Sequence, residues 1–364
     1  MPSKNSESSS SLYAVDVFAG GGGLTVGLKR AGLKVVAAVE NEKNAFATYK
    51  TNHPEVQAFK QDVQLVQGAS LRKQSPTNRI DLLAGCPPCQ GFSSLTSTRK
   101  TADPRNKLVR EMGRLVEEVR PRAVMMENVP GLAQKGKPLL DEFLKKLDDL
   151  EYVVRWSVLQ VADFGVPQSR RRLVLLAGKR FAIELPKPTH SRLGGNGLER
   201  WKTLRDALPA LPKPVTLTEA MRNGGPGHYD WHVVRTLSET NQARLAHTRP
   251  GKGRSQLPVE LRPDCHKGSD EGYNNVYGRM SWEQVPVTIT GGCTTLSKGR
   301  FGHPDEDRTL SVREAAYIQT FPDDYCFDTE HMEYVCSIIG NALPCDFAEV
   351  VARQCVEALR AATV

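Results

Sequence analysis

Short apolar segments alternate with helix-like segments along the first half of the chain, and this alternation limits the fold more than any other feature. The apolar segments are LYAVDVF (12–18), KVVAAVE (34–40), IDLLAG (80–85), PRAVMMENV (121–129), YVVRWSVLQ (152–160) and RLVLLAG (172–178). Residues 106–119 and 139–150, which lie between them, have the spacing of helices. Strands that alternate with helices build βαβ units, so the sequence predicts an α/β fold with a doubly wound, mostly parallel sheet.

The pattern changes near residue 183, where short stretches rich in glycine and proline replace the periodic segments until about residue 305. Helical spacing returns at 311–320 and in DFAEVVARQCVEALRAA (346–362). We therefore expect a catalytic domain made of 12–182 and 306–364, and a second, smaller irregular domain over 183–305. The serine-rich residues 1–11 are expected to be a disordered tail.

The composition narrows the cellular setting. The net charge of +8 suits a polyanionic partner, although an excess of this size also occurs in proteins that do not bind nucleic acid. Eight cysteines without a signal peptide indicate a reducing compartment rather than a disulfide framework. No window holds the roughly 18 apolar residues of a membrane-spanning helix, so no membrane partner is expected.

The segment GCPPCQGFS (85–93) places Cys89 behind two prolines, directly after an apolar segment. Parallel sheets carry their chemistry at the carboxyl ends of the strands, and the prolines stiffen the loop, so Cys89 is a candidate nucleophile. Cys86 and Cys89 also form a CxxC pair, which leaves a redox dithiol or half of a zinc site open; the other six cysteines supply no second close pair. A buried, inert thiol is the remaining alternative, and the polar residues after Cys89 argue against it.

A glycine cluster follows the first apolar segment, in DVFAGGGGLTVG. Gly20 and Gly22 form GxG, but Thr25 stands where the third glycine of a dinucleotide fingerprint would be. Glu40 ends the next apolar segment, at the separation where an acidic residue meets ribose hydroxyls, and Asp62 is placed to accept from an adenine amino group. These features indicate an adenosine cofactor without pyrophosphate; the alternative is that the glycines serve only helix packing.

Seven segments in this order resemble the motifs of the cytosine-C5 DNA methyltransferases, in the form found in prokaryotic restriction-modification. They are DVFAGGGG, GCPPCQGFS, DPRNKL (103–108), ENV (127–129), FGVPQSRRR (164–172), RTLSVREAAYIQTFPDDY (308–325) and IGNALP (339–344). The resemblance covers most of the chain outside 183–305, which it implies to be a target-recognition domain on a methyltransferase fold.

The resemblance implies S-adenosylmethionine as cofactor, S-adenosylhomocysteine as product, and no metal. The residues that it places around the cofactor are Phe18, Ala19, Gly20, Gly21, Gly22, Gly23, Leu24, Glu40, Asn41, Asp62, Val63, Leu108 and Asn341. Three residues depart from the family pattern: Asn41 replaces a large apolar or aromatic side chain, Gly21 replaces a larger residue, and Cys345 replaces a second proline.

The resemblance also implies the catalytic residues Cys89, Glu127, Arg170 and Arg172. A thiolate that adds to C6 of cytosine turns C5 into a nucleophile, and a carboxyl group facing N3 and the exocyclic amine neutralises the charge that builds on the ring. Glu127 is also open to the simpler role of a capping or salt-bridged carboxylate. The arginines, two positions apart, reach one face if the segment is extended, or else form a solvated surface run.

The implied partner is double-stranded DNA, from which the enzyme must flip the target cytosine. The expected DNA contacts are Gln90, Ser93, Arg105, Gln168, Arg170 and Arg172, with the basic residues Arg249, Lys252, Arg254, Lys298 and Arg300 of the irregular region as further candidates. A cognate restriction endonuclease that reads the same sequence without direct contact is a further expected partner. We expect a monomer in the prokaryotic cytoplasm, associated with the nucleoid.

Three other functions are weighed against this one. A tRNA cytosine-5 methyltransferase is the alternative within the same chemistry, and the sizeable recognition region favours DNA. A nicotinamide-dependent oxidoreductase is disfavoured by the missing third glycine. A DNA-binding module without activity is disfavoured because Cys89, Glu127 and both arginines are present.

Overall fold

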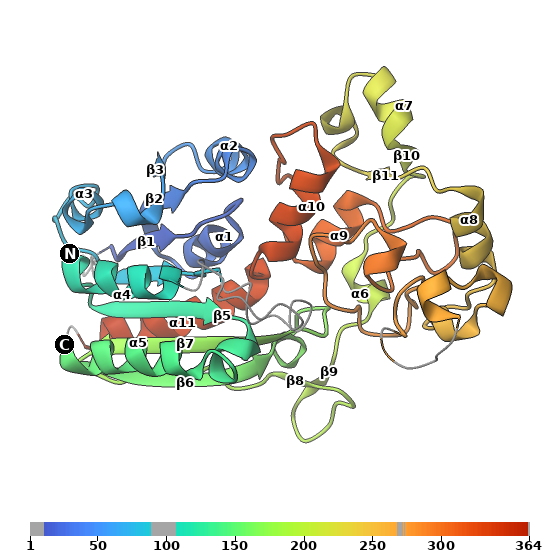
Figure 1. Ribbon diagram of the computed structural model, residues 1–364. Coiled ribbons are helices and arrows are strands. Elements are labelled where there is room, and N and C mark those ends of the chain that lie inside the picture. The colour runs from blue at the N-terminus through green and yellow to red at the C-terminus, as the bar shows by residue number, and fades with distance from the viewer. Residues whose placement is uncertain (1–10, 89–106, 268–271, 273, 363–364) are drawn as a thin grey trace, which may run out of the picture.

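The computed structural model of the chain describes residues 11–88, 107–267, 272 and 274–362. Its centre is a seven-stranded sheet in the order β3-β2-β1-β4-β5-β7-β6, in which β7 runs antiparallel to both of its neighbours (Figure 1). The strands are β1 (Tyr13–Val17), β2 (Lys34–Glu40), β3 (Gln57–Lys60), β4 (Leu82–Gly85), β5 (Ala123–Asn128), β6 (Tyr152–Gln160) and β7 (Arg171–Lys179). This sheet confirms the predicted α/β fold class.

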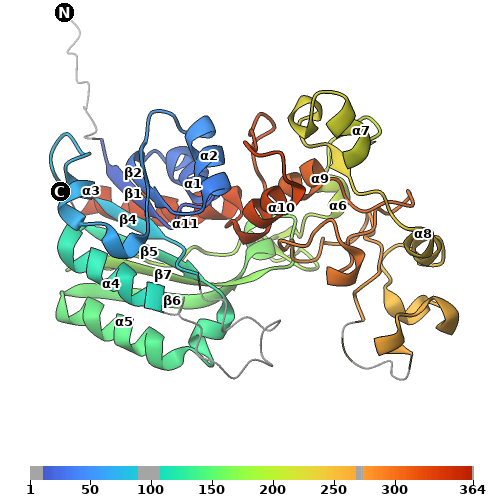
Figure 2. The ribbon, with the colours of Figure 1, turned by 45° about the horizontal axis from the view of Figure 1, so that its top comes forward.

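Helices cover both faces of the sheet because the strands are apolar on both sides. In β1, Val15 and Val17 belong to the core cluster under α3, α4 and α5, whereas Ala14 belongs to the cluster under α1 and α11. Figures 1 and 2 show α4 and α5 on one side of the sheet and α11 on the other. The helices of this part are α1 (Gly23–Arg30), α2 (Lys43–Asn52), α3 (Gly68–Arg72), α4 (Leu108–Val119), α5 (Lys137–Asp149) and α11 (Cys345–Ala361), with 3₁₀ turns η1 (Val63–Leu65), η5 (Pro130–Ala133) and η6 (Val161–Phe164).

The region after β7 is built from short elements around a third core cluster, which also includes Val26 of α1 and Ala45 of α2. They are β8 (His190–Ser191), β9 (Glu199–Arg200), α6 (Leu204–Ala207), β10 (Val215–Thr216), α7 (Leu217–Arg222), η7 (Pro226–Tyr229), β11 (Val233–Val234), α8 (Glu239–Ala246), η8 (Arg254–Gln256), η9 (Val259–Leu261), η10 (Asp264–His266) and η11 (Leu296–Lys298). Two further helices, α9 (Val312–Ile318) and α10 (Met332–Asn341), share this core, which contains Trp231, Phe301 and Ile339. The packing therefore does not divide at residue 305.

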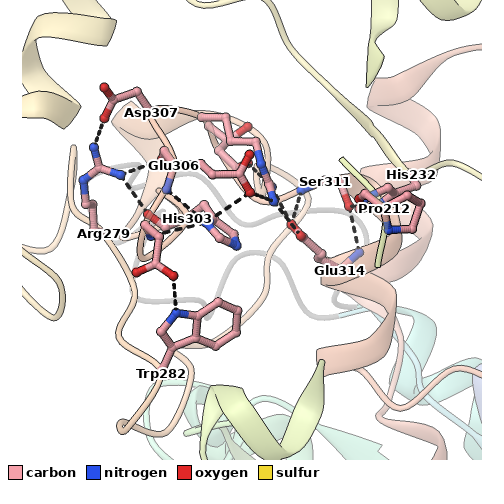
Figure 3. A network of polar contacts seen from close by, with 12 residues as sticks. Pro212, His232, Arg279, Trp282, His303, Glu306, Asp307, Ser311 and Glu314 are labelled. Carbon is pink, nitrogen blue, oxygen red and sulfur yellow. Dashed lines mark hydrogen bonds and ion pairs between the residues drawn. The ribbon is translucent and has the colours of Figure 1, made fainter. Parts of the chain in front are cut away.

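A polar network ties the irregular region to α9 (Figure 3). The buried Arg279 donates to the carbonyl oxygens of Leu245 at 3.0 Å and His303 at 2.9 Å. Arg308 then pairs with Glu314 of α9, at 2.8 Å between Nη1 and Oε2. These bonds attach the loop between Phe301 and Ser311 to both the irregular region and α9.

One stretch of the described chain, Met332–Ala361, has the length and hydropathy of a membrane-spanning segment, and 67% of its apolar 18-residue window is buried inside the protein. The structure divides it into α10 and α11, which are separated by Pro344. Its apolar residues form parts of two core clusters, and this packing accounts for the hydropathy.

Candidate active site

The carboxyl ends of β1, β2, β4 and β5 open onto one cavity of about 870 Å³. Fifteen of the predicted site residues line it: Phe18, Ala19, Gly20, Gly21, Gly23, Leu24, Glu40, Asn41, Asp62, Val63, Leu108, Glu127, Arg170, Arg172 and Asn341. The predicted residues Cys89, Gln90, Ser93 and Arg105 lie outside the described residues. The segment that leads to them, Cys86 to Pro88, lines the cavity.

The glycine loop between β1 and α1 uses its glycines for two different reasons. Gly20 has a φ of +54°, and a Cβ there would meet no atom within 4 Å, so this glycine faces open space at the cavity. Gly22 has a φ of +96°, and a Cβ there would collide with His53 and Tyr325 below the loop. The loop backbone is therefore open to the cavity at Gly20 and packs closely against His53 and Tyr325 at Gly22.

The support below the loop is a buried polar network that the sequence did not predict. Thr25 donates to Asp16 Oδ2 at 2.7 Å and lies 2.9 Å from the Tyr49 hydroxyl. Burial raises the pKa of Asp16 to about 7. Thr25 is the residue that occupies the place of a third glycine, and here it anchors the first helix to the sheet.

Glu40, at the end of β2, is hydrogen-bonded to the glycine loop. Its Oε2 accepts from the Gly20 N–H at 2.8 Å, and its Oε1 accepts from the Glu42 N–H at 2.7 Å. Burial raises the pKa of this carboxyl. Each carboxylate oxygen can accept more than one hydrogen bond, so Glu40 retains acceptor capacity toward the cavity. Asp62 lies on the same wall and caps η1 by accepting from the Gln64 N–H at 2.9 Å.

An ion pair forms a second part of the cavity wall. Glu127 of β5 lies 2.5 Å from Arg172 of β7, measured between Oε1 and Nε, and both side chains are largely buried. The neighbouring Asn128 donates to the Pro87 carbonyl at 2.9 Å, which fixes the end of β5 to the loop that leads to Cys89. Burial raises the pKa of the Cys86 thiol well above its usual value, and the nearby Glu127 adds to this effect. Cys86 therefore remains a thiol, which makes it a poor nucleophile.

Arg170 lines the cavity but is only 3% exposed. Its guanidinium donates to the carbonyl oxygens of Ile289 at 2.7 Å, Gly340 at 3.0 Å and Ala342 at 3.3 Å. These bonds join β7 to the irregular region and to the end of α10. The side chain thus positions three segments around the cavity, and its Nη atoms are already used on protein carbonyls instead of the expected DNA contact.

Gln168, a predicted DNA contact, has a fully buried side chain. It donates to Gln319 Oε1 at 2.7 Å and accepts from the Ile289 N–H at 3.0 Å. Arg254, a further candidate for DNA contact, is also fully buried, and it donates to Asn274 Oδ1 at 2.8 Å. Arg249, Lys252 and Lys298 are exposed.

The irregular region contributes part of the cavity wall, which sequence reasoning also missed. Thr288 to Gly291 line the cavity, and so do Tyr334, Ser337 and Ile338 of α10. Thr288 donates to the Ser169 carbonyl at 2.7 Å, so this segment is attached directly beside Arg170.

Among the described residues, no group of three or more His, Cys, Asp or Glu side chains is arranged to hold a metal ion.

Comparison with solved structures agrees with this architecture. A DNA modification methyltransferase encoded within an E. coli prophage superposes with a TM-score of 0.72 at 23% identity, covering 96% of this chain and 99% of that one. The Dnmt2 methyltransferase of S. pombe superposes with a TM-score of 0.66 at 17% identity, covering 97% of this chain and 99% of that one. At these identities the likeness establishes the fold.

Comparison of sequences identifies the family. The family model described as C-5 cytosine-specific DNA methylase matches residues 12–357. Type II methylase M.HgiDII of Herpetosiphon aurantiacus is 36% identical over 347 residues, which are 93% of each chain. Type II methyltransferase M1.HphI of Haemophilus parahaemolyticus is 31% identical, covering 94% of this chain and 86% of its own. These matches confirm the predicted resemblance, and the chain belongs to the C-5 cytosine-specific DNA methylase family.

Proposed function

We propose that this chain transfers a methyl group from S-adenosylmethionine to C5 of a cytosine flipped out of a specific double-stranded DNA sequence. The observation that carries the proposal is the single cavity that contains both the glycine loop with Glu40 and the Glu127–Arg172 pair. A donor held at one wall can meet a base held at the other, since both walls face the same space.

The residues of the first wall fit S-adenosylmethionine. The backbone at Gly20 faces open space, and Glu40 keeps acceptor capacity for ribose hydroxyls beside it. The amides of the first turn of α1 begin at Gly23 on the same wall, where an anionic carboxylate group is favoured. When bound, S-adenosylmethionine supplies the methyl group that C5 of cytosine accepts, and S-adenosylhomocysteine is the product.

The residues of the second wall suit the activation of cytosine. Cys89 lies outside the described residues, so we assign it as the nucleophile from the sequence. The residue before it, Pro88, lines the cavity. The Cys89 thiolate would add to C6 while the Glu127 carboxyl shares a proton with N3 and accepts from the exocyclic amine, so that negative charge on the ring is neutralised. Arg172 holds Glu127 in position for this contact. After C5 is methylated, a base takes the C5 proton, and the electron pair of that bond expels Cys89 from C6 as a thiolate.

We assign target recognition to residues 183–305. The exposed basic residues Arg249, Lys252 and Lys298 support this assignment, because they suit contacts with phosphates or guanine.

The names of the type II relatives support a bacterial restriction-modification role, and with it a cytoplasmic enzyme that acts on DNA. A restriction endonuclease that reads the same sequence, a monomeric state and association with the nucleoid belong to the same proposal.

Bisulfite sequencing tests this function and separates it from tRNA methylation. The chain and its Cys89→Ala variant are expressed in a host that lacks cytosine-5 methylation, and genomic DNA and tRNA are both sequenced. We expect protected cytosines in one short DNA sequence context with the unchanged chain, and none with the variant. Protection confined to tRNA would establish the alternative substrate, and no protection in either nucleic acid would contradict the proposal.

A further inference from the structure

One face of α10 forms a wall of the cavity. Tyr334, Ser337, Ile338 and Asn341 all line it, and their spacing of three, four and seven positions places them on one side of a helix. On the opposite side of the helix, Met332, Val335, Cys336 and Ile339 are buried in the core that α10 shares with the irregular region. The orientation of α10 is therefore fixed by packing, and so is the set of side chains that faces the cavity.

Ile338 brings this face close to the glycine loop. A Cβ on Gly21 would collide with Ile338 Cγ2, so the helix occupies the space that a larger residue at position 21 would fill. Asn341, one turn further along, donates from Nδ2 to Ser337 Oγ at 3.1 Å. The contact with Ile338 explains why this chain has glycine at position 21, where the family pattern has a larger residue.

Tyr334 lies at the other end of this face and remains 45% exposed. Its ring lies outside the three core clusters of the described residues and makes an edge contact with His331, with ring centroids 5.7 Å apart. A large aromatic side chain that lines a cavity without joining a core is suited to cover a flat ligand.

The segment just before α10 lies beside α2, which itself begins two residues after Asn41. Thr329 donates to Asn44 Oδ1 at 3.1 Å, and the Asp328 N–H donates to Thr48 Oγ1 at 3.0 Å. Figure 1 shows α10 next to α1 and α2, between the sheet and the irregular region. Tyr334 therefore belongs to the same end of the cavity as Asn41, which is an exposed residue with no apolar ring.

We propose that the ring of Tyr334 packs on the adenosine half of S-adenosylmethionine and supplies the flat apolar surface that Asn41 lacks. The inference rests on the proposed cofactor site. It assigns cofactor affinity to a residue of α10 that lies outside the IGNALP segment. An aromatic ring at either position 41 or position 334 could then pack on the adenosine half of the cofactor.

Isothermal titration calorimetry with S-adenosylhomocysteine, without DNA, tests the inference. Stacking of a base on an aromatic ring is worth enough for Tyr334→Ala to weaken binding on the order of tenfold. Tyr334→Phe keeps the ring and should bind like the unchanged protein. Trp156→Ala is the matched control, since Trp156 is a comparably exposed aromatic on β6 that does not line the cavity. Asn41→Trp added to Tyr334→Ala should restore most of the lost affinity.

The outcomes separate this inference from the proposed function. If the unchanged protein binds no S-adenosylhomocysteine, the cofactor site itself is refuted. If it binds, and folded Tyr334→Ala binds within about twofold of it, the role of Tyr334 is overturned while the site stands. Equal losses in Tyr334→Phe and Tyr334→Ala would also overturn it, because the hydroxyl and not the ring would then be responsible.

Discussion

At the residue scale, two carboxylates in the cavity have different partners. Glu40 accepts hydrogen bonds from the backbone of the loops around it, whereas Glu127 is paired with Arg172 beside the loop that leads to Cys89. The first arrangement leaves acceptors for hydroxyl groups, and the second holds a carboxyl in a fixed direction. The two residues should therefore affect different steps of the reaction.

Substitution of each carboxylate separates these steps. Glu127→Gln should leave S-adenosylhomocysteine binding close to normal and slow methyl transfer on the order of a hundredfold, because a positioned acid is lost. Glu40→Ala should weaken that binding instead. Calorimetry without DNA and single-turnover methylation of a DNA substrate measure the two effects, and normal turnover in Glu127→Gln would remove this residue from the mechanism.

The buried Asp16 gives the folded protein a predictable pH dependence. Its pKa is raised by burial to about 7, while the same group in the unfolded chain titrates near pH 4. Between these values the folded state holds a proton that the unfolded state has released, so the free energy of unfolding falls as the pH rises through this window. The full effect is at most on the order of 4 kcal/mol.

Asp16→Asn should remove this fall. Urea unfolding, followed by circular dichroism at pH 5 and pH 8, should show a smaller loss of stability in the variant than in the unchanged protein. Burial also lowers the pKa of His53 to about 4. His53 is present in both proteins, so it adds its own pH dependence to the free energy of unfolding of each. Equal pH dependence in the two proteins would mean that Asp16 is not the group responsible.

At the scale of elements, the long apolar segments predicted their strands well. Residues 34–40 and 152–160 form β2 and β6 with the expected ends, because strands buried on both faces are continuous apolar runs. The helix α10 was not predicted, because its cavity side mixes Tyr334 and Ile338 with the polar Ser337 and Asn341, so no continuous polar face marks the segment as a helix.

The contact between α1 and α11 depends on a glycine. A Cβ on Gly27 would collide with Ala348, so the helices approach each other more closely than larger residues would permit. Gly27→Ala should lower the free energy of unfolding by about 1–3 kcal/mol, the cost of overpacking, although alanine favours the helix itself.

Gly227→Ala is the matched control, because a Cβ at that position meets no atom within 4 Å. Denaturant unfolding of both variants measures the difference. Equal stability of Gly27→Ala and Gly227→Ala would contradict the assigned contact between the two helices.

At the scale of the whole molecule, the site joins segments that are distant in the sequence. Arg170 connects β7 to Ile289 and to Gly340, and Gln168 is bonded to the same region. The sequence placed both residues in a polar run beside a strand and thereby suggested a DNA surface. It did not reveal the burial, because the backbone groups that bond to these side chains belong to residues more than a hundred positions away.

In the proposed mechanism, Cys89 forms a covalent bond with the target cytosine. The glycine loop with Glu40 holds the methyl donor, and the Glu127–Arg172 pair lies beside the base. Fluorine at C5 cannot leave as the proton does, so an adduct with 5-fluorocytosine should persist after methyl transfer. Duplex DNA with this base at the methylated position should therefore form a complex that survives denaturing electrophoresis. The complex should accumulate only when S-adenosylmethionine is present.

The two cysteines of the loop provide the decisive comparison in this electrophoresis experiment. Cys86→Ser should still form the complex, because burial keeps the Cys86 thiol protonated and leaves it outside the covalent chemistry. Cys89→Ser should form none. A complex with Cys89→Ser but not with Cys86→Ser, or no complex with the unchanged protein on a sequence that it methylates, would contradict the account.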